Sequence, residues 1–96
     1  MKILIVGAGR IGCSVAESLV SEANDITVVD QDAERIGSLQ SRFDLRGVVG
    51  NATSPLVLTD AGAADTDMLI AVTSSDETNL VVTMLCARIF NIPTRI

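Results

Sequence analysis

The sequence contains no histidine, tyrosine or tryptophan, and its only aromatic residues are two phenylalanines. Histidine and tyrosine are common proton donors and acceptors in dehydrogenases, so an enzyme built from this chain alone would lack the usual catalytic acid or base. Two cysteines are too few for a disulfide framework or a metal cluster, and we expect Cys13 and Cys86 to be buried as small apolar residues.

Long apolar runs and an excess of positive charge are also missing. The apolar stretches fall short of the ~18 residues of a membrane-spanning helix, so we expect a cytoplasmic chain that reaches a membrane only through a partner protein. Acidic residues outnumber basic ones by 12 to 7, which gives a formal net charge of −5. Such a surface repels a phosphate backbone, and we expect no nucleic-acid partner.

Aliphatic residues are abundant instead, and 48% of the 96 residues are hydrophobic. Strand candidates rich in Ile, Val and Leu occupy residues 2–6, 25–29, 45–49 and 68–72. Aliphatic strands of this kind are typical of a parallel sheet that is buried on both faces. Helix-like segments separate these runs, which predicts an α/β fold with a Rossmann-like parallel sheet. We expect the mononucleotide-binding half of that fold, with strand order 3-2-1-4 and a truncated fifth strand at residues 94–96. Residues 1–96 would then be one N-terminal nucleotide-binding domain, a fragment of a longer protein.

The helical segments carry predictions about caps and buried faces. We expect Asp32 and Ser54 to cap the second and third helices, and Ser74, which has capping-box spacing to Glu77, to cap the fourth. The first helix is expected to bury one face made of Ile11, Val15, Leu19 and Val20. The fourth is expected to turn inward Leu80, Val81, Met84 and Leu85.

A glycine-rich turn, G-x-G-x-x-G, joins the first strand to the first helix. Gly7 would permit the sharp exit from the strand, Gly9 the close approach of a pyrophosphate, and Gly12 the close packing of the helix on the sheet. Such turns also occur only to pack a strand against a helix, but the position between a clear strand and a clear helix favours a phosphate site. Arg10 and Ile11 lie inside the turn as further candidates. Arg10 could clamp a phosphate or point into solvent.

Asp30 follows the second aliphatic run, at the place where the ribose acceptor of a dinucleotide site is expected. A carboxylate there can accept hydrogen bonds from both ribose hydroxyls and would repel a 2′-phosphate. Gln31 supplies no compensating cation. NAD(H), or another nucleotide with an unphosphorylated adenosine ribose, is therefore favoured over NADP.

Two further loops lie at the carboxyl ends of expected strands, the side on which such sheets bind ligands. Asn51, Ala52 and Thr53 follow the third strand, where small residues leave room for adenine and Asn51 offers a donor and an acceptor. Thr73 follows the fourth strand and could reach a phosphate or a second ribose. Asn79, one turn into the next helix, could also face the cleft.

These stretches together resemble the KTN/RCK family of nucleotide-binding domains, which regulate potassium transport. The resemblance covers essentially the whole chain and rests on MKILIVGAGRIG at the start, ITVVDQD at 26–32, GNAT at 50–53 and DMLIAVTSSDETN at 67–79. The glycine motif is shared with many Rossmann proteins, whereas the last run after GNAT is much more particular to this family.

The resemblance implies a cytosolic regulatory subunit that binds NAD(H) or ATP/ADP and biases a membrane potassium transporter between states. It implies phosphate contacts at the glycine turn and Arg10, ribose binding at Asp30, adenine near GNAT and the far end of the dinucleotide near Thr73. Many members carry aspartate where this chain has Asn51, and family domains continue through two further strands. A homo-oligomer, at least a dimer, is expected.

Two other functions fit the residues. The chain could be the cofactor-binding half of an NAD-dependent oxidoreductase whose catalytic groups lie elsewhere. It could also be a structural interaction module that binds no ligand, although the complete set of glycines with Asp30 argues against this. We favour the regulatory sensor over both.

Overall fold

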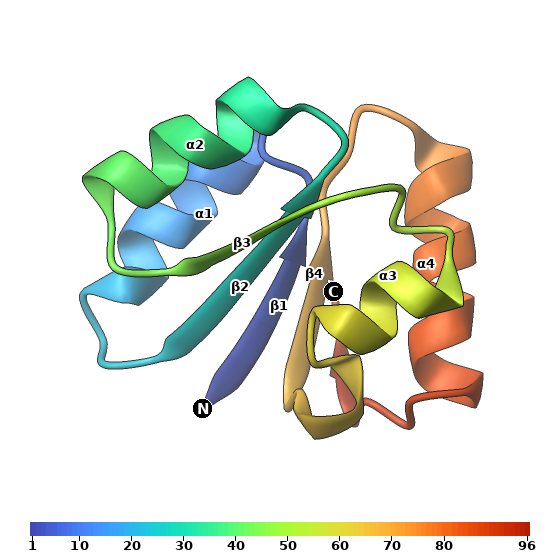
Figure 1. Cartoon of the computed structure of the whole chain (residues 1–96). Coiled ribbons are helices and arrows are strands. Elements are labelled where there is room, and N and C mark those ends of the chain that lie inside the picture. Colours follow the sequence, from blue (N-terminus) through green and yellow to red (C-terminus); the bar gives the residue numbers. More distant parts are fainter.

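Five parallel strands form a single sheet in the computed structural model, which describes residues 1–96 (Figure 1). The strands are β1 (Lys2–Val6), β2 (Asp25–Asp30), β3 (Arg46–Val49), β4 (Met68–Ala71) and β5 (Thr94–Arg95). Their order is β3-β2-β1-β4-β5, and every neighbouring pair is parallel. The α/β fold, the strand order and the start of a fifth strand are thereby confirmed.

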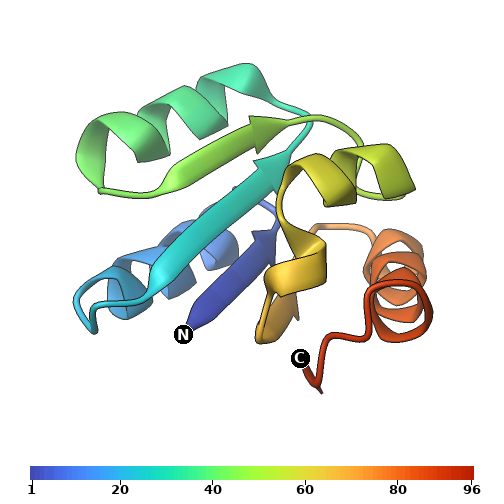
Figure 2. The same ribbon diagram turned by 60° about the horizontal axis from the view of Figure 1, so that its bottom comes forward.

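Helices cover both faces of the sheet (Figures 1 and 2). The helices are α1 (Arg10–Val20), α2 (Ala33–Arg42), α3 (Pro55–Asp60) and α4 (Asp76–Arg88), and a short 3-10 helix (Ala63–Asp65) follows α3. One face carries α1 and α2, and the other carries α3 and α4 (Figure 1). None of these helices is long and apolar enough to cross a membrane.

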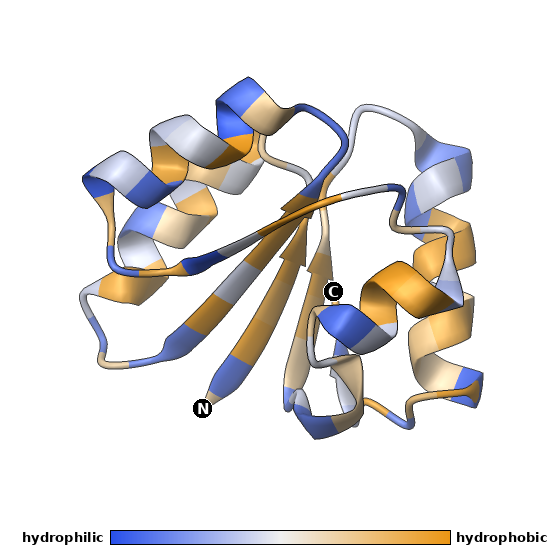
Figure 3. Ribbon diagram, in the orientation of Figure 1, coloured by the Kyte–Doolittle hydropathy of each residue, from blue (hydrophilic) through white to orange (hydrophobic).

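Strand β1 lies at the centre of the sheet and is buried on both faces. Leu4 and Val6 pack in the apolar cluster under α3 and α4, and the alternate residues Ile3 and Ile5 pack in the cluster under α1 and α2. These four side chains are at most 3% exposed. The hydropathy colouring shows the same concentration of apolar residues along the strands (Figure 3).

The prediction of which face of α4 is buried is wrong. Leu80, Val81 and Met84 are 62%, 41% and 42% exposed, whereas Val82 and Cys86 are completely buried. Only Leu85 packs inward as expected, as a partly buried side chain. Apolar residues of α4 lie around most of the circumference of the helix, so more than one set of positions repeats with the helical period. The sequence pattern therefore did not define a unique buried face.

Two smaller expectations about the helices also need correction. The N-cap of α4 is Ser75, whose hydroxyl accepts a hydrogen bond from the Thr78 amide, and Ser74 lies in the preceding loop. In α1, Ile11 is 63% exposed, because the helix packs on the sheet through the small residues Gly12 and Ala16. The expected cap Asp32 is confirmed, whereas the Ser54 side chain makes no capping hydrogen bond.

The two cysteines differ in environment. Cys86 is fully buried, as expected, but Cys13 is only partly buried, and its thiol donates to the Ala8 carbonyl oxygen over 3.3 Å. Burial raises the pKa of the Cys86 thiol to about 11, although the charge of Arg95 acts to lower it.

This shift predicts a loss of stability in alkali. Because the ordinary thiol pKa is 9.0, the unfolded chain releases the Cys86 proton before the folded chain does. We expect the free energy of unfolding to fall by about 2 kcal/mol as the pH rises from 9 towards 11. Denaturant unfolding across this range, compared with Cys86→Ala, measures the contribution. An equally steep fall in the alanine variant would contradict it.

Candidate functional site

A cleft of about 510 Å³ lies at the carboxyl ends of the strands, where β1, β2, β3 and β4 give way to loops. Four groups of residues line it: the glycine turn with the start of α1, the ends of β2 and β3 with the loops that follow them, Arg35 of α2, and the β4–α4 loop with the start of α4. The lining residues are Val6, Gly7, Gly9, Arg10, Ile11, Val29, Asp30, Gln31, Arg35, Gly50, Asn51, Ala52, Val72, Thr73, Ser74, Ser75 and Thr78.

The glycine turn fits tightly between the neighbouring strands. Gly7 has φ +115°, and a Cβ atom there would lie 2.8 Å from the Val72 carbonyl oxygen. A Cβ atom on Gly12 would overlap the carbonyl oxygen of Gly7. By contrast, a Cβ atom on Gly9 would meet only one neighbour within 4 Å, the Arg35 side chain at 3.8 Å. The outer two glycines therefore close the turn, and Gly9 leaves its surface open to the cleft.

The start of α1 presents unpaired amides beside this open surface. The amide groups of Gly9, Arg10, Ile11 and Gly12 donate no hydrogen bond within the protein, and no side chain caps the helix. Side chains do cap α2 and α4. Unpaired N–H groups and the positive end of the helix dipole attract anions, so this end of α1 is suited to a phosphate.

The Asp30 carboxylate is held at the opposite side of the turn by two backbone amides. One oxygen, Oδ2, accepts from the Ala8 amide over 2.7 Å, and the other, Oδ1, accepts from the Asp32 amide over 2.8 Å. Each carboxylate oxygen can accept a second hydrogen bond. Asp30 is thus fixed in one orientation at the cleft with capacity for two hydroxyl donors.

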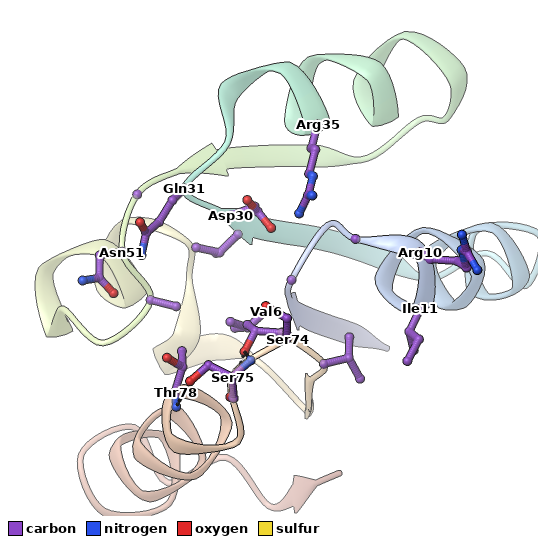
Figure 4. Close-up of a pocket in the computed structure, with 17 residues that line it drawn as sticks. Val6, Arg10, Ile11, Asp30, Gln31, Arg35, Asn51, Ser74, Ser75 and Thr78 are labelled. Atoms are coloured by element: carbon purple, nitrogen blue, oxygen red, sulfur yellow. Dashed lines mark hydrogen bonds between the residues drawn. The ribbon is translucent and has the colours of Figure 1, made fainter.

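The guanidinium group that lies over the glycine turn belongs to Arg35, which the sequence analysis missed. Arg35 extends from α2 towards Asp30 and the turn, whereas the Arg10 side chain points away from Asp30 (Figure 4). An ion pair to Asp32, 3.6 Å from Arg35 Nε to Oδ2, helps to hold it. A usable signal was present: side chains in the first turn of a helix lean towards its N-terminus, which here lies at the cleft. Gln31 supplies no cation beside Asp30, but the Arg35 guanidinium does, so the charge near Asp30 differs from the sequence-based expectation.

The loop after β3 supplies a small-residue wall. Ala52 is 6% exposed and packs in the apolar cluster under α3 and α4. The Asn51 side-chain oxygen is already engaged, since it accepts from the amide of Thr53 over 3.0 Å and from its hydroxyl over 2.8 Å. The side-chain NH₂ group of Asn51 is therefore its free polar group. Thr53 holds the Asn51 side chain and does not itself line the cleft.

The loop after β4 and the first turn of α4 supply the wall across from Asp30 and Arg35, with Ser74 and Ser75 in the loop and Thr78 in the helix (Figure 4). The Thr73 hydroxyl contacts the Asn79 side-chain oxygen at 2.6 Å. Asn79 itself does not line the cleft.

The structure gathers most, but not all, of the expected site residues around one cleft. The expected residues that line it are Gly7, Gly9, Arg10, Ile11, Asp30, Asn51, Ala52 and Thr73. Gly12, Thr53 and Asn79 do not line the cleft. Gly12 packs against Gly7, Thr53 donates a hydrogen bond to Asn51, and Asn79 accepts one from Thr73. Their binding roles stay predictions. Arg35 and Thr78 are additions that sequence reasoning did not provide.

Known proteins are similar to this chain in sequence and in fold. The chain is 54% identical over 96 residues to the Trk system potassium uptake protein TrkA of Haemophilus influenzae, and it spans 21% of that protein's length. A TrkA-N domain of the inner membrane protein ybaL from Escherichia coli superposes with a TM-score of 0.81 at 26% identity, covering 97% of this chain and 69% of that one.

A further neighbour shows the fold alone. The Kef C-terminal domain of Shewanella denitrificans, solved in an AMP-bound form, has a TM-score of 0.84 at 21% identity, with 99% of this chain and 57% of that chain covered. The sequence model of the TrkA-N domain matches residues 3–96, and the chain therefore belongs to the TrkA-N domain family.

Proposed function

We propose that this chain is a regulatory nucleotide-binding module of a potassium uptake system and that it performs no catalysis itself. The observation that carries the proposal is the joint placement of the unpaired amides of α1 and the fixed Asp30 carboxylate on one cleft. The first group suits a phosphate and the second suits a ribose. The name of the Haemophilus influenzae relative supports the link to potassium uptake.

The proposed ligand is NAD(H), with ATP or ADP as the alternative. All of them carry an adenosine ribose for Asp30 and phosphates for the start of α1. Adenine would lie towards Asn51 and Ala52, where the wall is small and polar. The Kef domain, which has the same fold, was solved in an AMP-bound form, and this supports an adenine nucleotide as the class of ligand. Discrimination between the ligands falls to the β4–α4 loop and to Arg35, which contact the parts beyond the adenosine.

The proposed mechanism is a shift between conformational states of a larger assembly. A ligand that contacts the glycine turn, Asp30 and the β4–α4 loop links three separate segments of the chain, and it favours whichever state brings them together. It can shift the equilibrium only by its difference in affinity for the two states. The assembly would contain at least two copies of this cytosolic chain and a membrane potassium transporter.

Isothermal titration calorimetry of the chain with NADH, NAD⁺, ATP and ADP tests the ligand proposal. We expect saturable binding of at least one of these nucleotides. Absence of heat with all four at millimolar concentration would favour a structural module without a ligand. Incubation with NADH and a panel of carbonyl substrates tests the oxidoreductase alternative. We expect no loss of nicotinamide absorbance, and substrate-dependent oxidation would support the enzyme.

A further inference from the structure

Asn79 holds the β4–α4 loop although it does not line the cleft. Its side-chain oxygen accepts from the Thr73 amide over 2.9 Å and from the Thr73 hydroxyl over 2.6 Å. Its side-chain nitrogen donates to the Thr73 carbonyl oxygen over 3.1 Å. The Asn79 side chain thus bonds to the amide, the hydroxyl and the carbonyl group of Thr73.

Capping of α4 does not require this arrangement. The hydroxyl of Ser75 already caps the helix by accepting from the Thr78 amide. Asn79 bonds only to Thr73 through its side chain, and Thr73 in turn accepts from the Ser75 amide over 3.2 Å. The hydrogen bonds of Asn79 therefore fix the conformation of the loop rather than the start of the helix.

The consequence appears at the next peptide unit. In a trans peptide the carbonyl and the following N–H point in opposite directions. Because the Thr73 carbonyl is directed to Asn79, the Ser74 amide is directed away from it. That amide donates no hydrogen bond within the protein, and Ser74 lines the cleft. The loop therefore offers an unpaired donor across from Asp30.

Sheet topology determines which part of a ligand this donor can meet. Strand β1, with the glycine turn, lies between β2 and β4, so Asp30 and Ser74 are separated by two strand spacings, roughly 10 Å. AMP held by Asp30, with its single phosphate, would end at the glycine turn. A dinucleotide continues across the turn to the β4–α4 loop.

We infer that Asn79 is a positioning residue that, through Thr73, directs the Ser74 amide towards the second half of a dinucleotide. This inference rests on the proposed nucleotide-binding function. Asn79 would then affect only ligands long enough to reach the loop, which separates it from a residue that simply supports the fold.

Calorimetry with two probes, NADH and AMP, tests this role on the unmodified chain, Asn79→Ala and Asn79→Asp. Aspartate keeps both acceptor contacts but cannot donate to the Thr73 carbonyl, so both variants should release the loop. We expect NADH affinity to fall about tenfold in each, as for the loss of one hydrogen bond to a charged group, while AMP affinity changes less than about twofold. The matched control is Thr83→Ala, which removes a hydroxyl that donates to the Asn79 carbonyl within the same helix and should change neither affinity.

Two outcomes would overturn the inference while leaving the proposed function intact. NADH affinity could be unchanged in both Asn79 variants, or NADH and AMP could weaken equally, which would indicate a general structural role. Thermal melting of each variant identifies any loss of folding, and the Ser74 amide resonance provides a second readout. NADH should shift this resonance in the unmodified chain and not in Asn79→Ala. If the unmodified chain binds neither NADH nor AMP, the inference fails, and the proposed function is then decided separately by the titrations with ATP and ADP.

Discussion

Gly12→Ala should destabilise the chain by about 3 kcal/mol, the upper end of the usual cost of overpacking. The added Cβ atom would overlap the carbonyl oxygen of Gly7, and that backbone cannot move freely. The Gly7 amide donates to the Val29 carbonyl oxygen over 2.9 Å, and Gly7 itself lies against Val72. Helix α1 would have to lift from the end of β1. Denaturant unfolding followed by circular dichroism measures the change.

The matched control is Gly37→Ala in the middle of α2. A Cβ atom there meets nothing within 4 Å, so this substitution should stabilise the chain by roughly 0.4–1 kcal/mol through the higher helix propensity of alanine. The free energy of unfolding is therefore expected to fall in Gly12→Ala and to rise in Gly37→Ala. A Gly12→Ala variant as stable as the unmodified chain would show that α1 is not held as closely to the sheet as described.

Asp30→Asn should weaken NADH binding by roughly 10- to 100-fold, the loss expected when hydrogen bonds to a charged acceptor are removed. The substitution keeps the shape of the side chain but replaces one acceptor oxygen with an NH₂ group, which also removes the hydrogen bond from the Ala8 or the Asp32 amide. Thermal melting of the variant measures this structural loss separately. The preference for NADH over NADPH should narrow at the same time, because the repulsion of a 2′-phosphate disappears while the Arg35 guanidinium remains nearby. Calorimetric titration with both cofactors measures the two effects.

Asp25→Asn is the matched control for charge. Asp25 starts the same strand, at the end of the sheet far from the cleft, so the net charge changes equally without any contact to the proposed ribose site. We expect NADH affinity to stay within about twofold. Equal weakening by the two substitutions would indicate a long-range electrostatic effect and would remove the ribose assignment of Asp30.

The sequence predicted the sheet because its signals were local and redundant. Strands β1 to β4 each contain consecutive aliphatic residues, and the glycine turn lies between a clear strand pattern and a clear helix pattern. Asp30 was identified by its distance along the chain from that turn. The strand patterns, the glycine turn and the spacing to Asp30 all follow from the backbone geometry of the strand–turn–helix unit, which every sequence with this fold must satisfy.

Side-chain direction was harder to predict because it depends on packing between distant segments. The inner face of α4 was misjudged because apolar residues surround most of the helix, and the fit of Val82 and Cys86 against the sheet decided it. Arg35 reaches the glycine turn from a different helix. Asn79 was expected at the cleft, but hydrogen bonds to Thr73, six residues earlier, direct it to the loop. None of these contacts leaves a periodic signature in the sequence.

The central position of β1 determines how the walls of the cleft move. Both edges of β1 are paired, so its amide hydrogens should exchange with deuterium only when the whole domain unfolds. Strands β3 and β5 each have one unpaired edge and should exchange through smaller local openings. The glycine turn therefore extends from the slowest-exchanging strand, whereas the Asn51 loop extends from an edge strand. We therefore expect the glycine-turn side of the cleft to keep its shape while the Asn51 side fluctuates.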